Sequence, residues 1–303
     1  MSPPTAELQA AGLTPAQAEV VEDKLGRVTL VKNMSWGNFD STVLLVARKV
    51  GPFVIKACGP GIGRHHLDRE LAAFRAGVTD RLGSHAARLL HVDEGLGVMV
   101  LNYLPGSLVF GSPFQLDPDT HRQAGRLLRQ IHSNPQTDTE WDAKATRRSL
   151  DWLDKEHRIP QPDAALTRLI LEDRISTLHP VEVVDTHGDY HPRNWLRDDA
   201  GTVRVIDWGR YERRPAFTDF IRCACQEWAE KPELGHAFAE GYGQDLRDTD
   251  DWKMEYLRQA VGTACWAPTI GDEKFEAQGI RMVAEALELL RSLAARLQSQ
   301  SRG

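Results

Sequence analysis

The sequence predicts an α+β protein with two lobes, an antiparallel sheet first and a mainly helical part after it. Up to about residue 103, short segments rich in β-branched and apolar residues alternate with glycine and proline turns. Beyond Gly106, apolar residues recur at the spacing of amphipathic helices. We therefore expect an N-terminal lobe over residues 1–103 and a C-terminal helical lobe over residues 104–303.

A short helix is expected to open the fold. Thr14 is a suitable N-cap, a proline follows it at the first helical position, and Gly26 comes after the last turn of Ala16–Leu25. The two ends of the chain lack such signals and are expected to be flexible, namely Met1–Gly12 and Gln298–Gly303.

Five strands and one helix should follow. The strands are rich in valine, isoleucine and leucine and are separated by turn residues. They are predicted at Val28–Lys32, Val43–Val50, Phe53–Ala57, Ala87–Val92 and Gly97–Tyr103. Arg64–Phe74 has helix formers throughout and ends near Gly77, which predicts a helix between the third and fourth strands.

The second part should contain several helices and few strands. Asp117-Pro118 begins a predicted helix that runs to about His132. Further helices are predicted at Ala165–Leu178, Phe217–Trp228, Met254–Trp266 and Ile280–Leu297. The strand candidates are Val181–Val184, Trp195–Leu196 and Val203–Ile206, and they flank two acidic loops.

Composition excludes several classes of protein. The 303 residues are 41% apolar and 26% charged, as in globular proteins. A formal charge of -6 without a long basic run argues against a nucleic-acid partner. No stretch has the length of a membrane span or the pattern of a signal peptide, so we expect a cytoplasmic protein without a membrane partner, either a monomer or a homodimer.

The cysteines predict neither a metal site nor a disulfide framework. They lack Cys-x-x-Cys spacing and are sparse for a chain of this length. We expect reduced and mostly buried thiols at Cys58, Cys223, Cys225 and Cys265.

The two acidic loops carry the residues that phosphoryl transfer from a nucleotide needs. That reaction requires one carboxylate near the acceptor hydroxyl and oxygen ligands for magnesium on the donor phosphates. Asp189 suits the first role, and Asn194 with Asp207 suits the second, because amide and carboxylate oxygens are hard ligands. A single aspartate in a loop is as readily a helix cap or a turn former. The spacing of Asp189, Asn194 and Asp207 instead favours a role in phosphoryl transfer.

A charged pair is predicted to accompany them. Lys56 lies on an apolar strand, where its charge is costly unless it meets a counter-charge or a phosphate. Glu70, on the following helix, is the natural partner. The alternative is a lysine on the solvent side of an edge strand.

Together these residues resemble the aminoglycoside phosphotransferase family, a small-molecule branch of the protein-kinase-like fold that includes choline and homoserine kinases. The resemblance covers about Val28 to Asp219. It rests on His187-Gly188-Asp189 with Asn194, Ile206-Asp207-Trp208, Val54-Ile55-Lys56, Glu70 and Leu101–Gly106. It implies a protein-kinase-like fold with nucleotide and Mg²⁺ in the cleft between the lobes.

The resemblance also implies roles for single residues. Asp189 is the catalytic residue, Asn194 and Asp207 are the metal ligands, and Lys56 with Glu70 holds the donor's α- and β-phosphates. Ser35 lies in the turn that covers the phosphates, a turn with one glycine only. The carbonyl of Asn102 and the amide of Leu104 would face a purine, with ATP as the default donor and GTP open. His187 organises the catalytic loop, and Asp219 anchors its backbone.

The expected activity is transfer of the γ-phosphoryl group to a hydroxyl of a small molecule. An antibiotic of the aminoglycoside, nucleoside or peptide type comes first, which would give resistance, and choline, homoserine or a sugar is the alternative. A protein substrate is disfavoured, because no Ala-Pro-Glu follows Asp207. A silent scaffold would have lost one of Lys56, Asp189 or Asp207.

Three other patterns in the sequence suggest different interpretations. A metal-dependent hydrolase would use His187 and His191, although Gly188 and Pro192 oppose the helix that such spacing needs. The run Gly59–Gly63 resembles a dinucleotide fingerprint, but an arginine stands where the third glycine belongs. A last group is expected to be mostly a solvated helix face: Tyr242, Asp245, Asp248, Asp250, Asp251, Trp252, Glu255 and Trp266.

Overall fold

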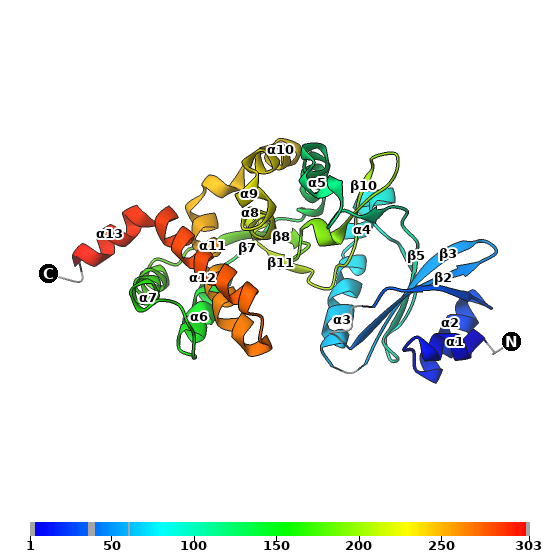
Figure 1. The fold of residues 1–303 in the computed structure, drawn as a ribbon. Coiled ribbons are helices and arrows are strands. Elements are labelled where there is room, and N and C mark those ends of the chain that lie inside the picture. The colour runs from blue at the N-terminus through cyan, green and yellow to red at the C-terminus, as the bar shows by residue number, and fades with distance from the viewer. Residues whose placement is uncertain (1–3, 36–39, 60, 301–303) are drawn as a thin grey trace. The chain divides into compact units, whose positions relative to one another are not determined.

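The computed structural model describes residues 4–35, 40–59 and 61–300 (Figure 1). The chain forms two compact units. Unit 1 contains residues 1–131, 187–212 and 241–243, and unit 2 contains residues 132–186, 213–240 and 244–303. Unit 1 thus joins the predicted N-terminal lobe to both acidic loops. The division does not follow the predicted lobe boundary between residues 103 and 104, and the roles of the two lobes stay a prediction.

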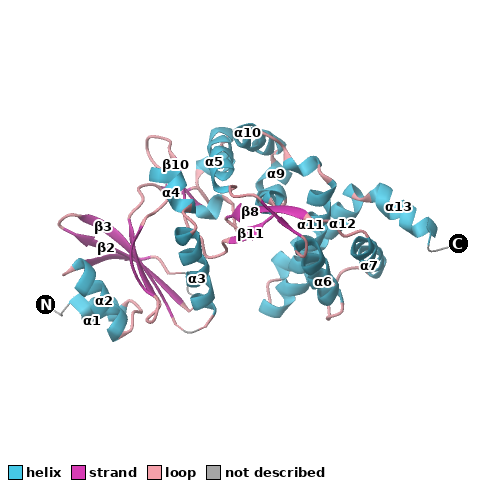
Figure 2. Ribbon diagram, turned by 180° about the vertical axis from the view of Figure 1, so that it is seen from behind, coloured by secondary structure: helices cyan, strands magenta, loops and turns pink. Residues whose placement is uncertain are grey.

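Unit 1 is built on an antiparallel sheet of five strands in the order β1-β2-β3-β5-β4. Figure 2 shows β2 and β3 of this sheet in magenta, near helices α1 and α2. All five lie where the sequence predicts them: β1 (Thr29–Asn33), β2 (Ser41–Arg48), β3 (Gly51–Cys58), β4 (Leu89–Asp93) and β5 (Val98–Asn102). β3 is the central strand. Lys56 therefore does not lie on an edge strand, since it pairs with Val43 of β2 and Met99 of β5.

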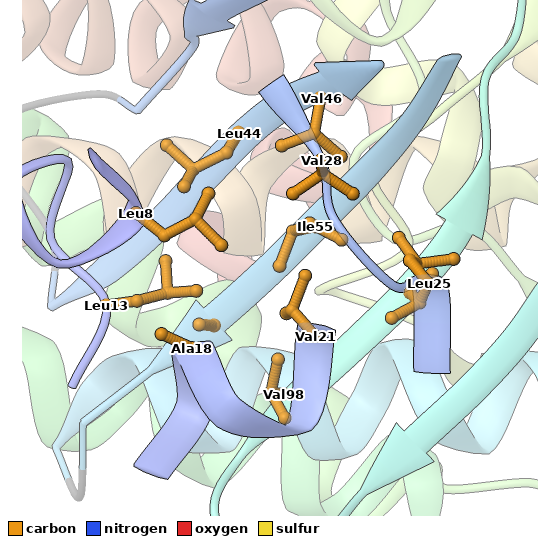
Figure 3. Close-up of a cluster of buried hydrophobic side chains, with 12 residues drawn as sticks. Leu8, Leu13, Ala18, Val21, Leu25, Val28, Leu44, Val46, Ile55 and Val98 are labelled. Carbon is orange, nitrogen blue, oxygen red and sulfur yellow. The ribbon is translucent and has the colours of Figure 1, made fainter. Parts of the chain in front are cut away.

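One face of this sheet is covered by the two N-terminal helices, α1 (Pro4–Ala10) and α2 (Pro15–Leu25). Figure 3 shows their side chains packed with Ile55 and other strand residues in one buried apolar cluster. The predicted cap of α2 is confirmed. The Thr14 side chain accepts from the Gln17 amide, and the Gln17 side chain accepts from the Thr14 amide.

Two chain ends differ from expectation. The flexibility expected for Met1–Gly12 is wrong for Pro4–Ala10, which forms α1 and leaves Leu8 only 1% exposed. Burying one leucine contributes about 1.5–3 kcal/mol, which outweighs weak local signals. Helix α13 (Arg291–Gln300) likewise includes the start of the predicted flexible end.

The opposite face of the sheet packs against α3 (Ile62–Arg75). Met99 of β5 lies there in a second buried cluster with Leu67 and Leu71. Because successive side chains of a strand point to opposite faces, Lys56 shares this face while its neighbour Ile55 belongs to the cluster under α2. This alternation puts the lysine beside the helix that carries Glu70.

The rest of unit 1 holds the acidic loops. A small antiparallel sheet has the order β10-β9-β6, with β9 (Trp195–Arg197), β10 (Val203–Val205) and β6 (Ser107–Leu108). The strands β9 and β10 are predicted, whereas β6 is not. A strand of two residues has no pattern of its own, and β6 is defined only by its pairing with the distant β9. The remaining helices are α4 (Val78–Leu82) and α5 (Pro118–Ile131), the latter as predicted.

Unit 2 is mainly helical around a small sheet with the order β11-β8-β7. The strands are β7 (Gln136–Asp138), β8 (Val181–Thr186) and β11 (Glu212–Arg214). The helices are α6 (Trp141–Leu153), α7 (Gln161–Ser176), α8 (Ile221–Ala224), α9 (Glu227–Glu230), α10 (Pro232–Tyr242), α11 (Asp250–Trp266), α12 (Glu273–Leu289) and α13. Among the described residues, none of the helices combines the length and apolarity required to cross a membrane.

Two helices of unit 2 are shorter than predicted. The region Phe217–Trp228 divides into a 3-10 turn, α8 and α9, because Gln226 leaves the helical region with φ -122° and ψ -101°. The region Ile280–Leu297 divides into α12 and α13 at Leu290. Helices α11 and α12 pack closely through Gly279, where a Cβ would lie 2.4 Å from the Ala264 nitrogen.

Candidate active site

The predicted catalytic loop follows β8 and packs against the second acidic loop. Gly188 has φ +81°, and a Cβ there would lie 2.0 Å from the Arg210 carbonyl oxygen. Only glycine allows both this conformation and this close approach. The backbone amide of Ile206 also donates to the Asn194 carbonyl at 3.0 Å. The two loops are therefore held together within unit 1.

Asp189 and Asn194 are brought together as predicted. The Asn194 side-chain amide donates to the Asp189 carbonyl at 2.8 Å and to its carboxylate Oδ2 at 3.3 Å. His191 Nε2 lies 3.5 Å from the same oxygen. The Asp189 carboxylate keeps 21% of its side chain exposed, so it is oriented by its neighbours and still accessible.

His187 is buried and connects the loops. Its Nε2 lies 3.1 Å from the Ile206 carbonyl oxygen, and its Nδ1 lies 3.3 Å from the Asp189 amide nitrogen. A carbonyl can only accept and a backbone amide can only donate, so these contacts fit a neutral imidazole protonated at Nε2. This geometry suits an organising residue.

Asp207 approaches the predicted lysine–glutamate pair. Lys56 Nζ donates to both carboxylate oxygens of Glu70, at 2.8 and 2.7 Å, and lies 3.6 Å from Asp207 Oδ1. The side chain of Glu70 is 5% exposed, whereas that of Asp207 is 56% exposed. One ammonium group thus bridges a buried carboxylate and an accessible one.

The backbone and charge of Asp207 are both unusual. Its φ of +66° lies in the left-handed region, which side chains other than glycine rarely adopt and which concentrates at functional sites. Desolvation by the surrounding protein opposes its charge, but the Lys56 ammonium outweighs this and lowers the pKa of Asp207. Desolvation likewise opposes the charge of Lys56, yet Glu70 and Asp207 raise its pKa. Lys56 is therefore held as a cation.

The donor atoms fit a magnesium ion. The carboxylate of Asp207 is accessible, and the side-chain NH₂ of Asn194 is engaged by Asp189, which leaves its amide oxygen for another ligand. Among the described residues, no hydrogen bond reaches that oxygen. Mg²⁺ takes few protein oxygens and completes its shell with water and phosphate oxygens.

The hydrolase alternative would place a metal ion on His187 and His191. The described residues contain no group of three or more histidine, cysteine, aspartate or glutamate side chains arranged to hold a metal ion. His187 and His191 contact the Ile206 carbonyl and Asp189, respectively.

The predicted phosphate-covering turn is only partly described. Residues 36–39 lie outside the described residues. Ser35 Oγ accepts from the Val43 amide at 2.9 Å, and the Ser35 amide donates to Asn33 Oδ1 at 2.9 Å. These bonds hold Ser35 just after the end of β1 and beside Val43 of β2, and its contact with phosphate stays a prediction.

The predicted linker, Leu101–Gly106, begins within β5, and its role between two lobes stays a prediction. The Asn102 side chain accepts from the Arg88 amide at 2.5 Å, and the Asn102 amide donates to the Arg88 carbonyl at 3.2 Å. Leu104 is buried, at 6% exposure. The contacts of Asn102 and Leu104 with a purine stay predictions.

The structure corrects one further sequence prediction and explains a second sequence pattern. The solvated helix face is wrong for Tyr242, Trp252 and Glu255, which are buried. Glu255 is paired with Arg258 at 3.5 Å, which allows its burial. The glycine run has a packing cause, since a Cβ at Gly59 would lie 2.2 Å from Asp40 Oδ2.

Asp219 is buried in unit 2, where its Oδ2 lies 3.1 Å from His132 Nε2. Its predicted role in anchoring the catalytic loop stays a prediction.

Sequence reasoning missed three residues that hold the site. Tyr190 is fully buried and donates its hydroxyl to the Ala124 carbonyl of α5 at 2.8 Å, which fixes the residue after Asp189. Arg69 of α3 lies 3.3 Å from Glu212, near the end of the second acidic loop. The aromatic character of the residue after Asp189 was a usable signal for Tyr190, whereas nothing local predicts the Arg69–Glu212 pair.

Comparisons with solved structures agree with this fold. An aminoglycoside phosphotransferase APH(4)-Ia mutant, crystallised with AMP-PNP and hygromycin B, matches with a TM-score of 0.66 and 14% identity, over 91% of this chain and 98% of that one. The choline kinase LicA from Streptococcus pneumoniae matches with a TM-score of 0.63 and 15% identity, over 89% and 96%. The macrolide 2'-phosphotransferase MphH from Brachybacterium faecium gives 0.61 and 16%, over 88% and 95%.

These likenesses establish a protein-kinase-like fold and confirm the predicted fold class. No curated protein sequence matches the chain. The model of the phosphotransferase enzyme family, APH, matches residues 31–254, which is most of the chain and includes both acidic loops. The chain therefore belongs to the phosphotransferase enzyme family.

Proposed function

We propose that this protein transfers the γ-phosphoryl group of ATP or GTP to a hydroxyl group of a small molecule. The observation that carries the proposal is a set of contacts within unit 1: Asn194 bonds to Asp189, the Ile206 amide bonds to Asn194, and the next residue, Asp207, approaches the Lys56–Glu70 pair. A structural ion pair alone needs no accessible carboxylate, whereas phosphate-bound magnesium does. The nucleotide complex of the APH(4)-Ia relative supports a nucleotide donor.

The residues divide the reaction among them. Asp189 orients the acceptor hydroxyl and takes its proton as the oxygen bonds to the γ-phosphorus, while the bond to the leaving nucleoside diphosphate breaks. Lys56, held by Glu70, contacts the α- and β-phosphates. Asn194 and Asp207 would hold Mg²⁺, which supplies charge neutralisation on the phosphates when bound.

The remaining roles follow the two lobes predicted from the sequence. Residues 1–103 bind the nucleotide, with Ser35 at the phosphates and Asn102 and Leu104 at the purine. Residues 104–303 supply the catalytic loop and the acceptor site. We further propose a cytoplasmic monomer or homodimer without nucleic-acid or membrane partners.

The proposed classes of acceptor follow from the activities of the similar solved structures. Aminoglycoside and macrolide phosphotransferases among the similar structures favour an antibiotic acceptor and a role in resistance. A choline kinase among them supports the second candidate, a metabolite kinase for choline, homoserine or a sugar.

A screen tests the activity directly. The protein is incubated with Mg²⁺ and ATP or GTP and with aminoglycoside, nucleoside and peptide antibiotics, choline, homoserine and sugars. We expect one acceptor class to gain the mass of one phosphate group, only when nucleotide is present. A mass loss by hydrolysis in the absence of nucleotide would contradict the proposal.

A further inference from the structure

Arg193 is the single exposed residue of the catalytic loop. From His187 to Trp195, all of which the structure describes, every other residue is buried or half-buried. Arg193 directly precedes Asn194, whose side chain is bonded to Asp189. Neighbouring Cα atoms lie only about 3.8 Å apart, so this cation is anchored close to the proposed site of transfer.

The guanidinium group of Arg193 is held in place by an aromatic ring. Its Cζ lies 4.3 Å from the centre of the Phe110 ring. The Phe110 amide donates to the carbonyl of Pro192 at 3.1 Å, so ring and loop are joined through the backbone as well. Phe110 is itself 40% exposed. The contact orients the cation at an open surface without neutralising its charge.

In the part of the chain that the structure describes, no carboxylate neutralises Arg193, since none of the ion pairs or side-chain hydrogen bonds there involves it. Arg197, four residues further on, has a similar ring contact, with Cζ 4.4 Å from the centre of the Phe114 ring. In contrast, Arg197 is bonded to Asp117 and lies 3.9 Å from Asp119. The charge of Arg197 on Phe114 is thus neutralised within the fold. The charge of Arg193 on Phe110 is available to an anionic ligand.

We infer that Arg193 binds an oxyanion of the acceptor, either a carboxylate or a phosphate monoester. This rests on the proposed function and narrows its acceptors to hydroxyl compounds that also carry a negative group, against polycationic aminoglycosides. A guanidinium presents parallel N–H donors that match both oxyanions. Its fixation on Phe110 means that little side-chain freedom is lost when the anion binds. Arg193 is thereby a specificity-determining residue.

Matched acceptors test this inference. Homoserine is compared with homoserinamide, and glucuronate with glucuronamide, so that each pair differs in the carboxylate alone. Glycerol 3-phosphate and glycerol form the phosphate pair. We expect the wild type to favour the anionic member of at least one pair by about tenfold or more in kcat/KM, the scale of one charged hydrogen bond. Which pair responds identifies the oxyanion.

Variants assign the preference to the charge. Arg193→Met should remove most of the preference through a higher KM for the anion, and Arg193→Glu should reverse it. Arg193→Lys should retain a part of it. Phe110→Leu should weaken it, since the charge stays but its platform is lost. Arg126→Met, which removes an exposed arginine of α5, is the control and should keep the wild-type preference.

Three outcomes would overturn the inference. They are equal use of both members of every pair, equal loss of preference in Arg193→Lys and Arg193→Met, and turnover of neutral or cationic acceptors only. In the last case the proposed kinase activity would still stand. The absence of any nucleotide-dependent transfer would instead reject both.

Discussion

The two units each contain a cluster of ion pairs, and the clusters differ in one respect. In unit 2, Asp142 accepts from Arg174 at 2.8 Å and also bonds to Arg258, and its side chain is only 1% exposed. In unit 1, Lys56 joins buried Glu70 to Asp207, whose side chain is 56% exposed. We call the first cluster closed because its shared carboxylate is buried between two arginines, although Arg174 also pairs with Asp251, whose side chain is 33% exposed. We call the second cluster open because its shared cation pairs with a carboxylate that is more than half exposed. The two clusters thus differ in the exposure of the carboxylate at their centre.

The closed cluster should give the largest effect on stability. Asp142→Ala leaves Arg174 and Arg258 without their shared carboxylate, and breaking a buried pair costs about 3–5 kcal/mol. We expect a clear fall in the urea midpoint at unchanged slope. Asp207→Ala is the matched variant of the open cluster and should shift the midpoint far less. Equal shifts in the two variants would remove the distinction between the clusters.

Nucleotide binding should depend on the lysine of the open cluster. Lys56→Met removes the cation that joins Glu70 to Asp207 and, in our proposal, the contact with the donor phosphates. One charged hydrogen bond corresponds to about ten- to a hundredfold in affinity, so the Kd for the Mg²⁺-nucleotide should rise by that factor. Isothermal titration measures it. Lys144→Met, which removes an exposed lysine of α6, should leave the Kd unchanged.

The pH dependence of the open cluster should be small and confined to acid. Lys56 holds the pKa of Asp207 below its ordinary value of about 3.9, so the Lys56–Asp207 attraction persists from there up to the alkaline pH at which Lys56 loses its proton. It is lost as the pH falls through the lowered pKa. The difference in urea midpoint between wild type and Asp207→Asn should be constant between about pH 5 and pH 8 and shrink in stronger acid. A difference that grows with acidity would contradict the lowered pKa.

The fold was predictable where local signals are strong. Strands β1 to β5 and helices α2 and α3 carry their own periodicity, turns and caps, so they lie where the sequence places them. Helix α1 was missed because Leu8 is held by the sheet and not by a local pattern. Strand β6 was missed because Ser107 and Leu108 pair only with distant β9.

The candidate site was predictable as a set of residues but not as a geometry. The spacing of Asp189, Asn194 and Asp207 indicates the chemistry, and the alternation of β3 indicates that Lys56 turns away from Ile55. The left-handed conformation of Asp207 and the hydroxyl of Tyr190 on Ala124 depend on contacts between segments far apart in sequence. Such contacts leave no periodic signature.

The central claim is that Asp189 acts on the acceptor and not on the nucleotide. The most direct measurement is phosphate transfer by Asp189→Ala beside its Kd for the Mg²⁺-nucleotide. Loss of a general base should lower transfer by about 10²- to 10⁴-fold. We expect that loss with a nearly unchanged Kd. Transfer at the wild-type rate would contradict the account, as would a loss of nucleotide binding large enough to explain the defect.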